Sequence, residues 1–274
     1  MAFTETGFSE PWTMGLASIK GNVRSENQDY GLCLRGRGYE VMVIADGLGG
    51  VPLGRAASRC AVQGAVEAIQ GAIPTIGQQG PSLQAVASLA MDAAGKALHA
   101  EGEKRHIATI ADGLRTTLII VIANDREIAF SFIGDGGGVI LGADGLTTRF
   151  VQPQKVAANV LQASLGPVVQ GAPVCGTLAR QPGDLLIVGT DGVFDTVDES
   201  FIEDVMRTAH ENLGDLQRTA EQIVQELASF RDGLGFVCDD NMTLGLLGGR
   251  VAPAPSGAKA AAACPAVPIA SKER

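Results

Sequence analysis

Residues 117–133 read TLIIVIANDREIAFSFI and contain two apolar runs, Thr117–Ala123 and Ile128–Ile133. Each run has the length of one strand and is nearly all apolar, as expected for a strand that is buried on both faces. The gap between the runs is short and contains Asn124-Asp125, residue types that favour tight turns. We therefore expect an antiparallel hairpin here, because parallel neighbours need a long crossover connection.

Further runs of the same kind lie on both sides of this hairpin. One of them is followed by Ala143-Asp144-Gly145, which predicts a second hairpin turn. The further expected strands are Glu40–Ala45, Gly138–Gly142, Val174–Leu178, Leu185–Gly189 and Met242–Leu247.

Two longer regions carry helical patterns, and each is interrupted once. Pro74 and Pro81 punctuate the first region, and Gly214 the second. Pairs of helices inserted into a strand-rich chain indicate an α+β protein whose sheets are covered by helices. The expected helices are Gly54–Ile69, Ser82–Lys104, Glu199–Asn212 and Leu216–Phe230.

One change in composition divides the chain. From Val251 onward the sequence is rich in Ala and Pro and has no apolar period. Such a segment is typical of a flexible tail. We expect one domain over residues 1–250 and a flexible Ala/Pro-rich tail over residues 251–274.

The composition excludes several classes of partner. The formal net charge is −9 with no basic run, so nucleic acid is not an expected partner. No stretch approaches the roughly 20 apolar residues that span a bilayer, so no membrane is expected. The five cysteines are an odd number and lie far apart, which argues against a disulfide framework and a zinc site. We expect a soluble monomer in the reducing cytoplasm.

The dipeptide Asp-Gly occurs six times, and its usual role is to form turns. Asp46, Asp135 and Asp191 differ from the rest because each follows an apolar run directly. Asp240 instead lies just before a predicted strand. Side chains at strand ends are rigidly held yet open to solvent, which suits carboxylates that bind hard cations such as Mg²⁺ or Mn²⁺.

The other three Asp-Gly pairs favour a structural reading. Asp144 lies in a predicted hairpin turn, Asp112 follows no strand, and Asp232 follows a helix, where a cap or turn is expected. His99, His106 and His210 all fall in or beside helical segments and are not expected to be ligands.

Seven segments, in order, carry a further signal. They read ASIKGNVRSENQDYG, VIADGLGG, LRTTLIIVIA, FIGDGGGVIL, ASLG, GDLLIVGTDGVFD and DDNMTLGLL, and they extend from about Gly15 to Leu247. Together they resemble the motifs of the PPM family, the metal-dependent serine/threonine protein phosphatases of type 2C, bacterial type. The resemblance implies a four-layer α/β/β/α sandwich, in which two antiparallel sheets are flanked by helix pairs.

The resemblance also assigns roles to individual residues. Arg24 would bind the substrate phosphate, as the planar fork of a guanidinium can do. Asp46 would bridge two Mn²⁺ or Mg²⁺ ions, with the backbone carbonyl of Gly47 on one of them. Asp29 would hold waters on the first ion, and Asp191 and Asp240 would complete the shell of the second. Asp135 with Asp191 would bind a weaker third ion. Asn241 would support Asp240, and Thr116 and Thr117 would support the local fold.

The implied reaction is direct hydrolysis of phosphoserine and phosphothreonine in proteins. A water that bridges two tightly bound ions attacks phosphorus in line. Phosphoprotein substrates and a cognate Ser/Thr kinase are the implied partners.

Four positions depart from the family's motifs. Leu48 stands where some members carry a histidine that protonates the leaving group. Gly136-Gly137 replace the Ser-Arg that usually follows Asp135, Thr190 replaces a serine, and Arg115 replaces a glycine. Two alternatives stay open: an inactive family member that binds phosphoproteins as a regulator, and a hydrolase of small phosphoesters.

Overall fold

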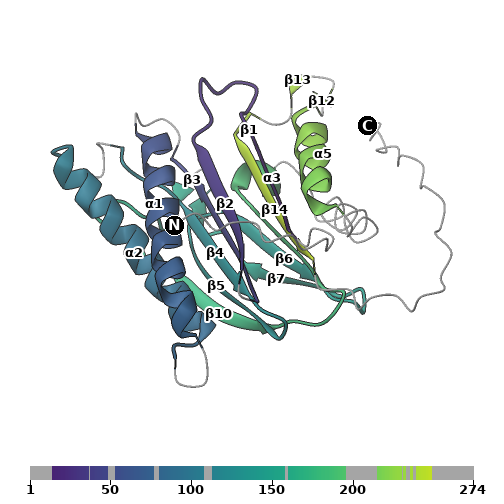
Figure 1. Ribbon diagram of the computed structural model, residues 1–274. Coiled ribbons are helices and arrows are strands. Elements are labelled where there is room, and N and C mark those ends of the chain that lie inside the picture. The colour runs from purple at the N-terminus through teal and green to yellow at the C-terminus, as the bar shows by residue number, and fades with distance from the viewer. Residues whose placement is uncertain are drawn as a thin grey trace, which may run out of the picture.

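Two five-stranded antiparallel sheets form the centre of the molecule (Figure 1). The computed structural model describes residues 14–36, 38–48, 53–76, 80–107, 113–157, 160–195, 215–229, 231–232, 235–236 and 239–248. The first sheet has the order β1 (Met14–Ile19), β14 (Met242–Gly248), β11 (Leu185–Gly189), β6 (Gly137–Leu141) and β7 (Thr147–Val151). The second has the order β10 (Val174–Ala179), β5 (Glu127–Ile133), β4 (Leu118–Ala123), β3 (Tyr39–Asp46) and β2 (Asp29–Gly36).

Helices cover the outer faces of both sheets. In Figure 1, α1 and α2 lie along the second sheet and α5 lies against the first, on the opposite side. Ser82 caps α2 by accepting a hydrogen bond from the backbone N–H of Ala85. The bounds are α1 Gly54–Ala72, the 3₁₀ turn η1 Ile73–Thr75, α2 Leu83–Lys104, α3 Asp191–Phe194 and α5 Leu216–Ser229. Two short hairpins complete the described elements: β8 Lys155–Ala157 with β9 Val160–Leu161, and β12 Arg231–Asp232 with β13 Gly235–Phe236.

Strand β3 shows how the layers arise from the sequence. Successive side chains of a strand point to opposite faces. Val41 and Val43 belong to the core under α1 and α2, whereas Met42 and Ile44 belong to the core between the two sheets. A strand that is buried on both faces therefore needs the continuous apolar run that its sequence shows.

Three apolar cores separate the four layers. The first lies between α1, α2 and the second sheet, the second between α5 and the first sheet, and the third between the sheets. Small side chains such as Ala61 and Ala65 on α1 and Ala90 and Ala94 on α2 let the two helices pack closely, which fits the low aromatic content of 4%. The predicted α+β sandwich is therefore confirmed.

Within the described residues, each predicted strand and helix is present. Strand ends differ from the prediction by one residue at most, and α1 continues three residues further. The predicted helix Glu199–Asn212 and the predicted tail 251–274 lie outside the described residues, as does Asp112. Asp232 lies in β12 rather than in a cap or turn, so that expectation was wrong.

Seven strands were not predicted: β1, β2, β7 and the four strands of the two short hairpins. Strands β1, β2 and β7 are three of the four sheet edges. Edge strands are partly exposed and carry polar residues and glycine, so they lack the continuous apolar run that marks a central strand. No helix in the described part of the chain is both long enough and apolar enough to cross a bilayer.

Candidate active site

Five aspartates gather where strands of both sheets end. Asp29 is the first residue of β2 and Asp46 the last of β3, and the two lie opposite each other in the strand register. Asp135 lies in the turn between β5 and β6, Asp191 begins α3 directly after β11, and Asp240 precedes β14. Antiparallel strands from two sheets thus bring residues far apart in sequence to one end of the sandwich.

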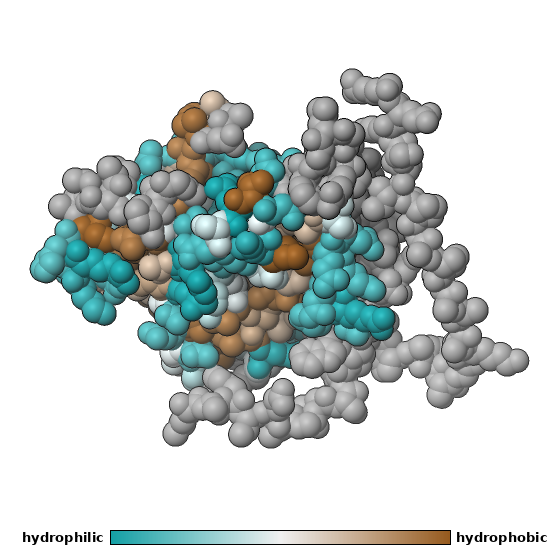
Figure 2. Space-filling model, turned by 90° about the horizontal axis from the view of Figure 1, so that it is seen from above, coloured by the Kyte–Doolittle hydropathy of each residue, from teal (hydrophilic) through white to brown (hydrophobic). Residues whose placement is uncertain are grey.

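This end of the molecule faces the viewer in Figure 2, which looks down from the top of Figure 1. Hydrophilic residues predominate on its described surface, with smaller hydrophobic groups between them. Such a surface is suited to a charged, hydrated ligand.

Asp29 is held by two hydroxyl groups from the other sheet. Its Oδ2 accepts hydrogen bonds from Oγ1 of Thr190 at 2.9 Å and from Oγ1 of Thr243 at 2.8 Å. The Thr190 Oγ1 also accepts a bond from the backbone N–H of Thr243 at 3.0 Å. These bonds tie the two sheets together directly under the carboxylates.

The backbone of Asp46 is fixed by the two threonines that precede β4. The Asp46 N–H donates to Oγ1 of Thr117 at 3.0 Å, and its carbonyl accepts from Oγ1 of Thr116 at 2.7 Å and from the N–H of Thr117 at 2.8 Å. Gly47 continues this contact, because it forms an isolated bridge with Thr116. These bonds fix the end of β3, which carries Asp46, to the segment that precedes β4.

Asp191 is positioned by the glycine that follows it. A Cβ at Gly192 would overlap the backbone carbonyl of Asn241. Only glycine lets α3 approach the start of β14 so closely, and this approach brings Asp191 near Asp240. The Asn241 N–H donates to Oδ1 of Asp240 at 2.8 Å, while the Asn241 amide oxygen accepts from the N–H of Gly21 at 3.2 Å.

Arg24 reaches the cluster from the loop between β1 and β2. Its Nη2 lies 2.5 Å from Oδ2 of Asp240. This hydrogen bond raises the pKa of Arg24, and the charges of Asp240, Asp46 and Asp191 add to the effect. The Nε of Arg24 is buried and has no hydrogen-bond partner among the described residues.

Lys155 is a further charged residue at this end, and the sequence reasoning missed it. Its Nζ lies 2.5 Å from Oδ2 of Asp195, 3.4 Å from Oδ2 of Asp135 and 4.0 Å from Oδ2 of Asp191. Burial lowers the pKa of Lys155, but the bond with Asp195 and the charge of Asp135 outweigh it, so the net pKa is raised. The available sequence signal was that Lys155 is the only charged residue between Arg149 and Arg180.

Burial makes the carboxylates costly to ionise together. It raises the pKa of Asp29 to about 6, although the contact with Asp46 and the hydroxyls of Thr243 and Thr190 act in the opposite direction. Burial and the charge of Asp29 raise the pKa of Asp46 well above its usual value. Burial and the charges of Asp135 and Asp240 raise the pKa of Asp191 to about 7. Like charges and desolvation both disfavour the ionised form of these carboxylates, so a bound cation would stabilise the ionised site.

The donor set fits a hard divalent cation. Oδ1 of Asp29 and Oδ1 of Asp191 are buried and have no hydrogen-bond partner among the described residues. In the part of the chain that the structure describes, no group of three or more His, Cys, Asp and Glu side chains is arranged so that it could hold an ion. That spacing is compatible with Mg²⁺ or Mn²⁺, because Mg²⁺ in particular keeps several waters and takes few carboxylates directly.

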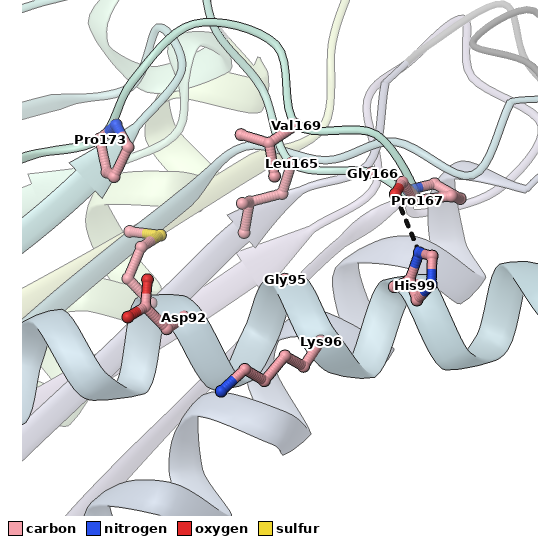
Figure 3. Close-up of a pocket in the computed structure, with 10 residues that line it drawn as sticks. Asp92, Gly95, Lys96, His99, Leu165, Gly166, Pro167, Val169 and Pro173 are labelled. Carbon is pink, nitrogen blue, oxygen red and sulfur yellow. Dashed lines mark hydrogen bonds between the residues drawn. The ribbon is translucent and has the colours of Figure 1, made fainter.

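A cavity of about 370 Å³ lies away from the carboxylates, between α2 and residues 165–173 (Figure 3). In Figure 3, His99 points up from α2, and its Nδ1 lies 3.2 Å from the carbonyl oxygen of Pro167. His99 is exposed and makes no contact with the site, as its helical position predicted. The cavity contains none of the clustered aspartates, so its chemistry is separate from theirs.

Arg115 is buried beneath the loop that borders this cavity. Its Nη2 donates to Oγ of Ser164 and, at 3.0 Å, to Oε1 of Gln170. Arg115, which stands where the family motif has glycine, therefore anchors residues 164–170 with its side chain. The structure thus accounts for one of the four departures.

With the motif order, the fold and the aspartate cluster in agreement, the chain falls in the class of serine/threonine protein phosphatases. It belongs to the protein phosphatase 2C family, whose model matches residues 21–228. The predicted family and enzyme class are thereby confirmed.

Relatives and solved structures extend this result. Protein phosphatase PhpP of Streptococcus pneumoniae is 25% identical over 254 residues, which cover 85% of this chain and 96% of PhpP. The serine/threonine phosphatase PstP/Ppp of Mycobacterium tuberculosis has the same fold, with a TM-score of 0.67 at 20% identity over 85% of this chain and 97% of that one. The catalytic domain of PstP in complex with two manganese ions gives a TM-score of 0.65 at 20% identity, over 86% and 97%.

Proposed function

We propose that this chain hydrolyses phosphoserine and phosphothreonine in proteins with a binuclear Mn²⁺ or Mg²⁺ centre. The observation that carries the proposal is the group of buried Asp29 and partly buried Asp46 and Asp191, in which two buried carboxylate oxygens have no hydrogen-bond partner among the described residues. Two divalent ions offset this negative charge and fill the free coordination positions. The matching PstP domain was solved with two manganese ions, which supports the same number here.

Each aspartate has a distinct role in the proposed centre. Asp46 would bridge the ions, because it lies opposite Asp29 on the neighbouring strand and the charges of Asp29 and Asp191 both raise its pKa. The carbonyl of Gly47 would ligate one ion, and Asp29 would hold waters on the same ion. Asp191 and Asp240 would complete the shell of the other, and the N–H of Asn241 supports Asp240.

When bound, the ions supply a nucleophilic water at neutral pH and polarise the phosphate. Thr190 and Thr243 orient Asp29 for its ion, as hydrogen bonds to metal ligands commonly do. The third ion expected at Asp135 and Asp191 stays a prediction. Lys155 forms ion pairs with both of these carboxylates and therefore competes with such an ion.

Arg24 binds the substrate phosphate. Its Nε is a buried donor that has no partner among the described residues, and its guanidinium lies beside Asp240 at the centre. An arginine can donate two parallel hydrogen bonds to a phosphate and offset charge on its equatorial oxygens. When an ion engages Asp240, we expect Arg24 to exchange this carboxylate for the phosphate.

The surface beside the site favours a protein substrate over a small phosphoester. Val23, next to Arg24, is 66% exposed, and Val156, next to Lys155, is 65% exposed. These side chains offer apolar contacts to residues that flank a phosphorylated side chain. We further propose a cytoplasmic monomer opposed by a cognate Ser/Thr kinase, with the catalytic domain in residues 1–250 and a flexible tail in residues 251–274.

Steady-state kinetics of site variants with Mn²⁺ tests the proposal. For Asp46→Asn we expect kcat/KM on p-nitrophenyl phosphate to fall by about 100-fold or more, because a bridging ligand supports charge stabilisation worth several kcal/mol. Asp144→Asn is the matched control, since Asp144 also precedes glycine but lies in the hairpin turn and bonds the N–H of Leu146. Equal loss in both variants, or no loss in Asp46→Asn, would contradict the assignment.

A second comparison separates the substrate classes. Val156→Asp should lower kcat/KM on a phosphothreonine peptide and leave p-nitrophenyl phosphate hydrolysis unchanged. A wild-type preference for small phosphoesters over phosphopeptides would instead favour the small-phosphoester hydrolase. Phosphopeptide binding without any turnover would favour the inactive regulator.

A further inference from the structure

The ammonium group of Lys155 stands among three carboxylates at the edge of the site. Its Nζ contacts Asp195 at 2.5 Å, Asp135 at 3.4 Å and Asp191 at 4.0 Å. Only 17% of the Lys155 side chain and 8% of the Asp135 side chain are exposed. A largely buried cation therefore already lies within 4.0 Å of both Asp135 and Asp191.

Backbone contacts place Lys155 there. The preceding residue, Gln154, donates its N–H to the carbonyl of Gly134 at 2.9 Å, and its Oε1 accepts the N–H of Gly134 at 2.8 Å. This pair of bonds fastens the start of β8 to the turn that carries Asp135. The bonds of Gln154 therefore position Lys155, the next residue, beside Asp135.

The residues after Asp135 leave no room for the usual side chains. A Cβ at Gly137 would overlap the ring of Phe194, the last residue of α3, and one at Gly136 would lie 2.7 Å from the carbonyl oxygen of Gly189. The Ser-Arg of the family motif therefore cannot be accommodated in this packing. The positive charge near Asp135 comes from β8 instead.

A divalent ion and this ammonium cannot share the position. A Mg²⁺ ion ligated by Asp135 and Asp191 would lie about 2.0–2.1 Å from their oxygens. Those oxygens are themselves 3.4 Å and 4.0 Å from Nζ, so the two cations would lie side by side in a poorly solvated space and repel each other strongly.

We infer that Lys155 takes the place of the third cation, so that this chain binds two divalent ions rather than three. The inference rests on the proposed binuclear centre. A tethered ammonium offsets the charge of Asp135 at every metal concentration, and it joins the β8–β9 hairpin to the site. Asp135 is then a partner of Lys155 rather than a metal ligand.

Metal counting tests this inference without using activity. We would measure the number of Mn²⁺ ions bound at saturation by equilibrium dialysis with elemental analysis. The wild type and Lys155→Arg, which keeps the charge, should bind two ions. Lys155→Met, which keeps the length but removes the charge, should bind three, and Lys155→Met/Asp135→Asn should return to two. Melting curves would establish that each variant is folded.

The outcomes separate the inference from the proposed function. Three ions in the wild type, or two in folded Lys155→Met, would overturn the role of Lys155 and leave the binuclear centre standing. No bound ions in the wild type would overturn both. If Lys155→Met does not fold, anomalous diffraction from wild-type crystals soaked in Mn²⁺ decides: a peak between Asp135 and Asp191 contradicts the inference, and two peaks elsewhere in the site support it.

Discussion

Asp29 and Asp46 lie directly opposite each other on the antiparallel strands β2 and β3, and Asp29 also accepts hydrogen bonds from Thr190 and Thr243. Burial raises the pKa of both carboxyl groups. The charge of Asp29 raises the pKa of Asp46 further, whereas the contact with Asp46 lowers that of Asp29. The metal-free protein therefore stores electrostatic strain at the place where the cations are proposed to bind. The following predictions use this relationship and the contacts around it.

The stability of the metal-free protein should fall as pH rises from about 4 to about 7. The folded pKa of Asp29 is about 6 and that of Asp191 about 7, both above the usual value of 3.8. The folded state then binds more protons than the unfolded state across this window, so stability is greatest below it and is lost as pH rises through the folded pKa values. Thermal unfolding in EDTA measures this slope. A metal-free protein that gains stability over the same window would contradict the account.

Mn²⁺ should reverse this trend. Ions bind the ionised carboxylates of the folded state, so the increase in Tm on adding Mn²⁺ should be larger at pH 8 than at pH 5. The matched control is Asp191→Asn, in which both the slope in EDTA and the effect of Mn²⁺ should be smaller. An equal increase in Tm at both pH values would count against carboxylate ligands.

Replacing Asp46 by Asn should stabilise the metal-free protein while it inactivates the enzyme. The change removes a buried charge that is opposed by Asp29 and Asp191, and one pKa unit corresponds to about 1.4 kcal/mol. We expect the free energy of unfolding in EDTA to rise by on the order of 1–3 kcal/mol at pH 8. Urea denaturation measures it. A loss of stability would show that Asp46 serves the fold rather than the site.

Thr190 should act through Asp29. In Thr190→Val, Asp29 loses one hydroxyl donor and the N–H of Thr243 loses its acceptor. We expect the apparent affinity for Mn²⁺ to fall by about 10-fold to 100-fold, as for other residues that orient metal ligands. Thr190→Ser keeps the hydroxyl and should stay near the wild type. Equal affinities in Val and Ser variants would exclude this role.

Arg115 should stabilise the loop over residues 164–170. Removing its side chain in Arg115→Met leaves the Ser164 hydroxyl and the Gln170 amide without this donor. We expect a loss of about 1–3 kcal/mol in unfolding free energy and faster hydrogen exchange in the loop. Arg115→Lys should recover part of the loss. Unchanged exchange in residues 164–170 would show that the loop does not depend on this anchor.

Local sequence signals were sufficient for the central strands and for the aspartates at strand ends, Asp46, Asp135, Asp191 and Asp240. A strand such as β3 is buried on both faces and must be apolar over most of its length. Its apolar run, and Asp46 at the end of that run, can therefore be recognised in the amino-acid sequence. The edge strands β1, β2 and β7 were missed because polar residues or glycine interrupt their apolar runs. The motif resemblance placed Asp29 although β2 itself was not predicted.

Lys155 and the bonds of Thr190 could not be read from local patterns. The contact between Lys155 and Asp135 depends on how the segment after β7 folds back onto the turn that follows β5, which is a matter of tertiary packing. The overlap that a side chain at Gly192 would produce with Asn241 likewise joins segments about 50 residues apart in sequence. Such contacts decide which of several aspartates meet, and only the fold displays them.

The most direct test of the central claim is hydrolysis of a phosphothreonine peptide by metal-stripped protein as Mn²⁺ is added back. We predict no turnover without metal, a rate that rises to saturation with Mn²⁺, and complete loss on adding excess EDTA. Equal turnover by the metal-stripped protein, or no turnover at any Mn²⁺ concentration, would contradict the claim.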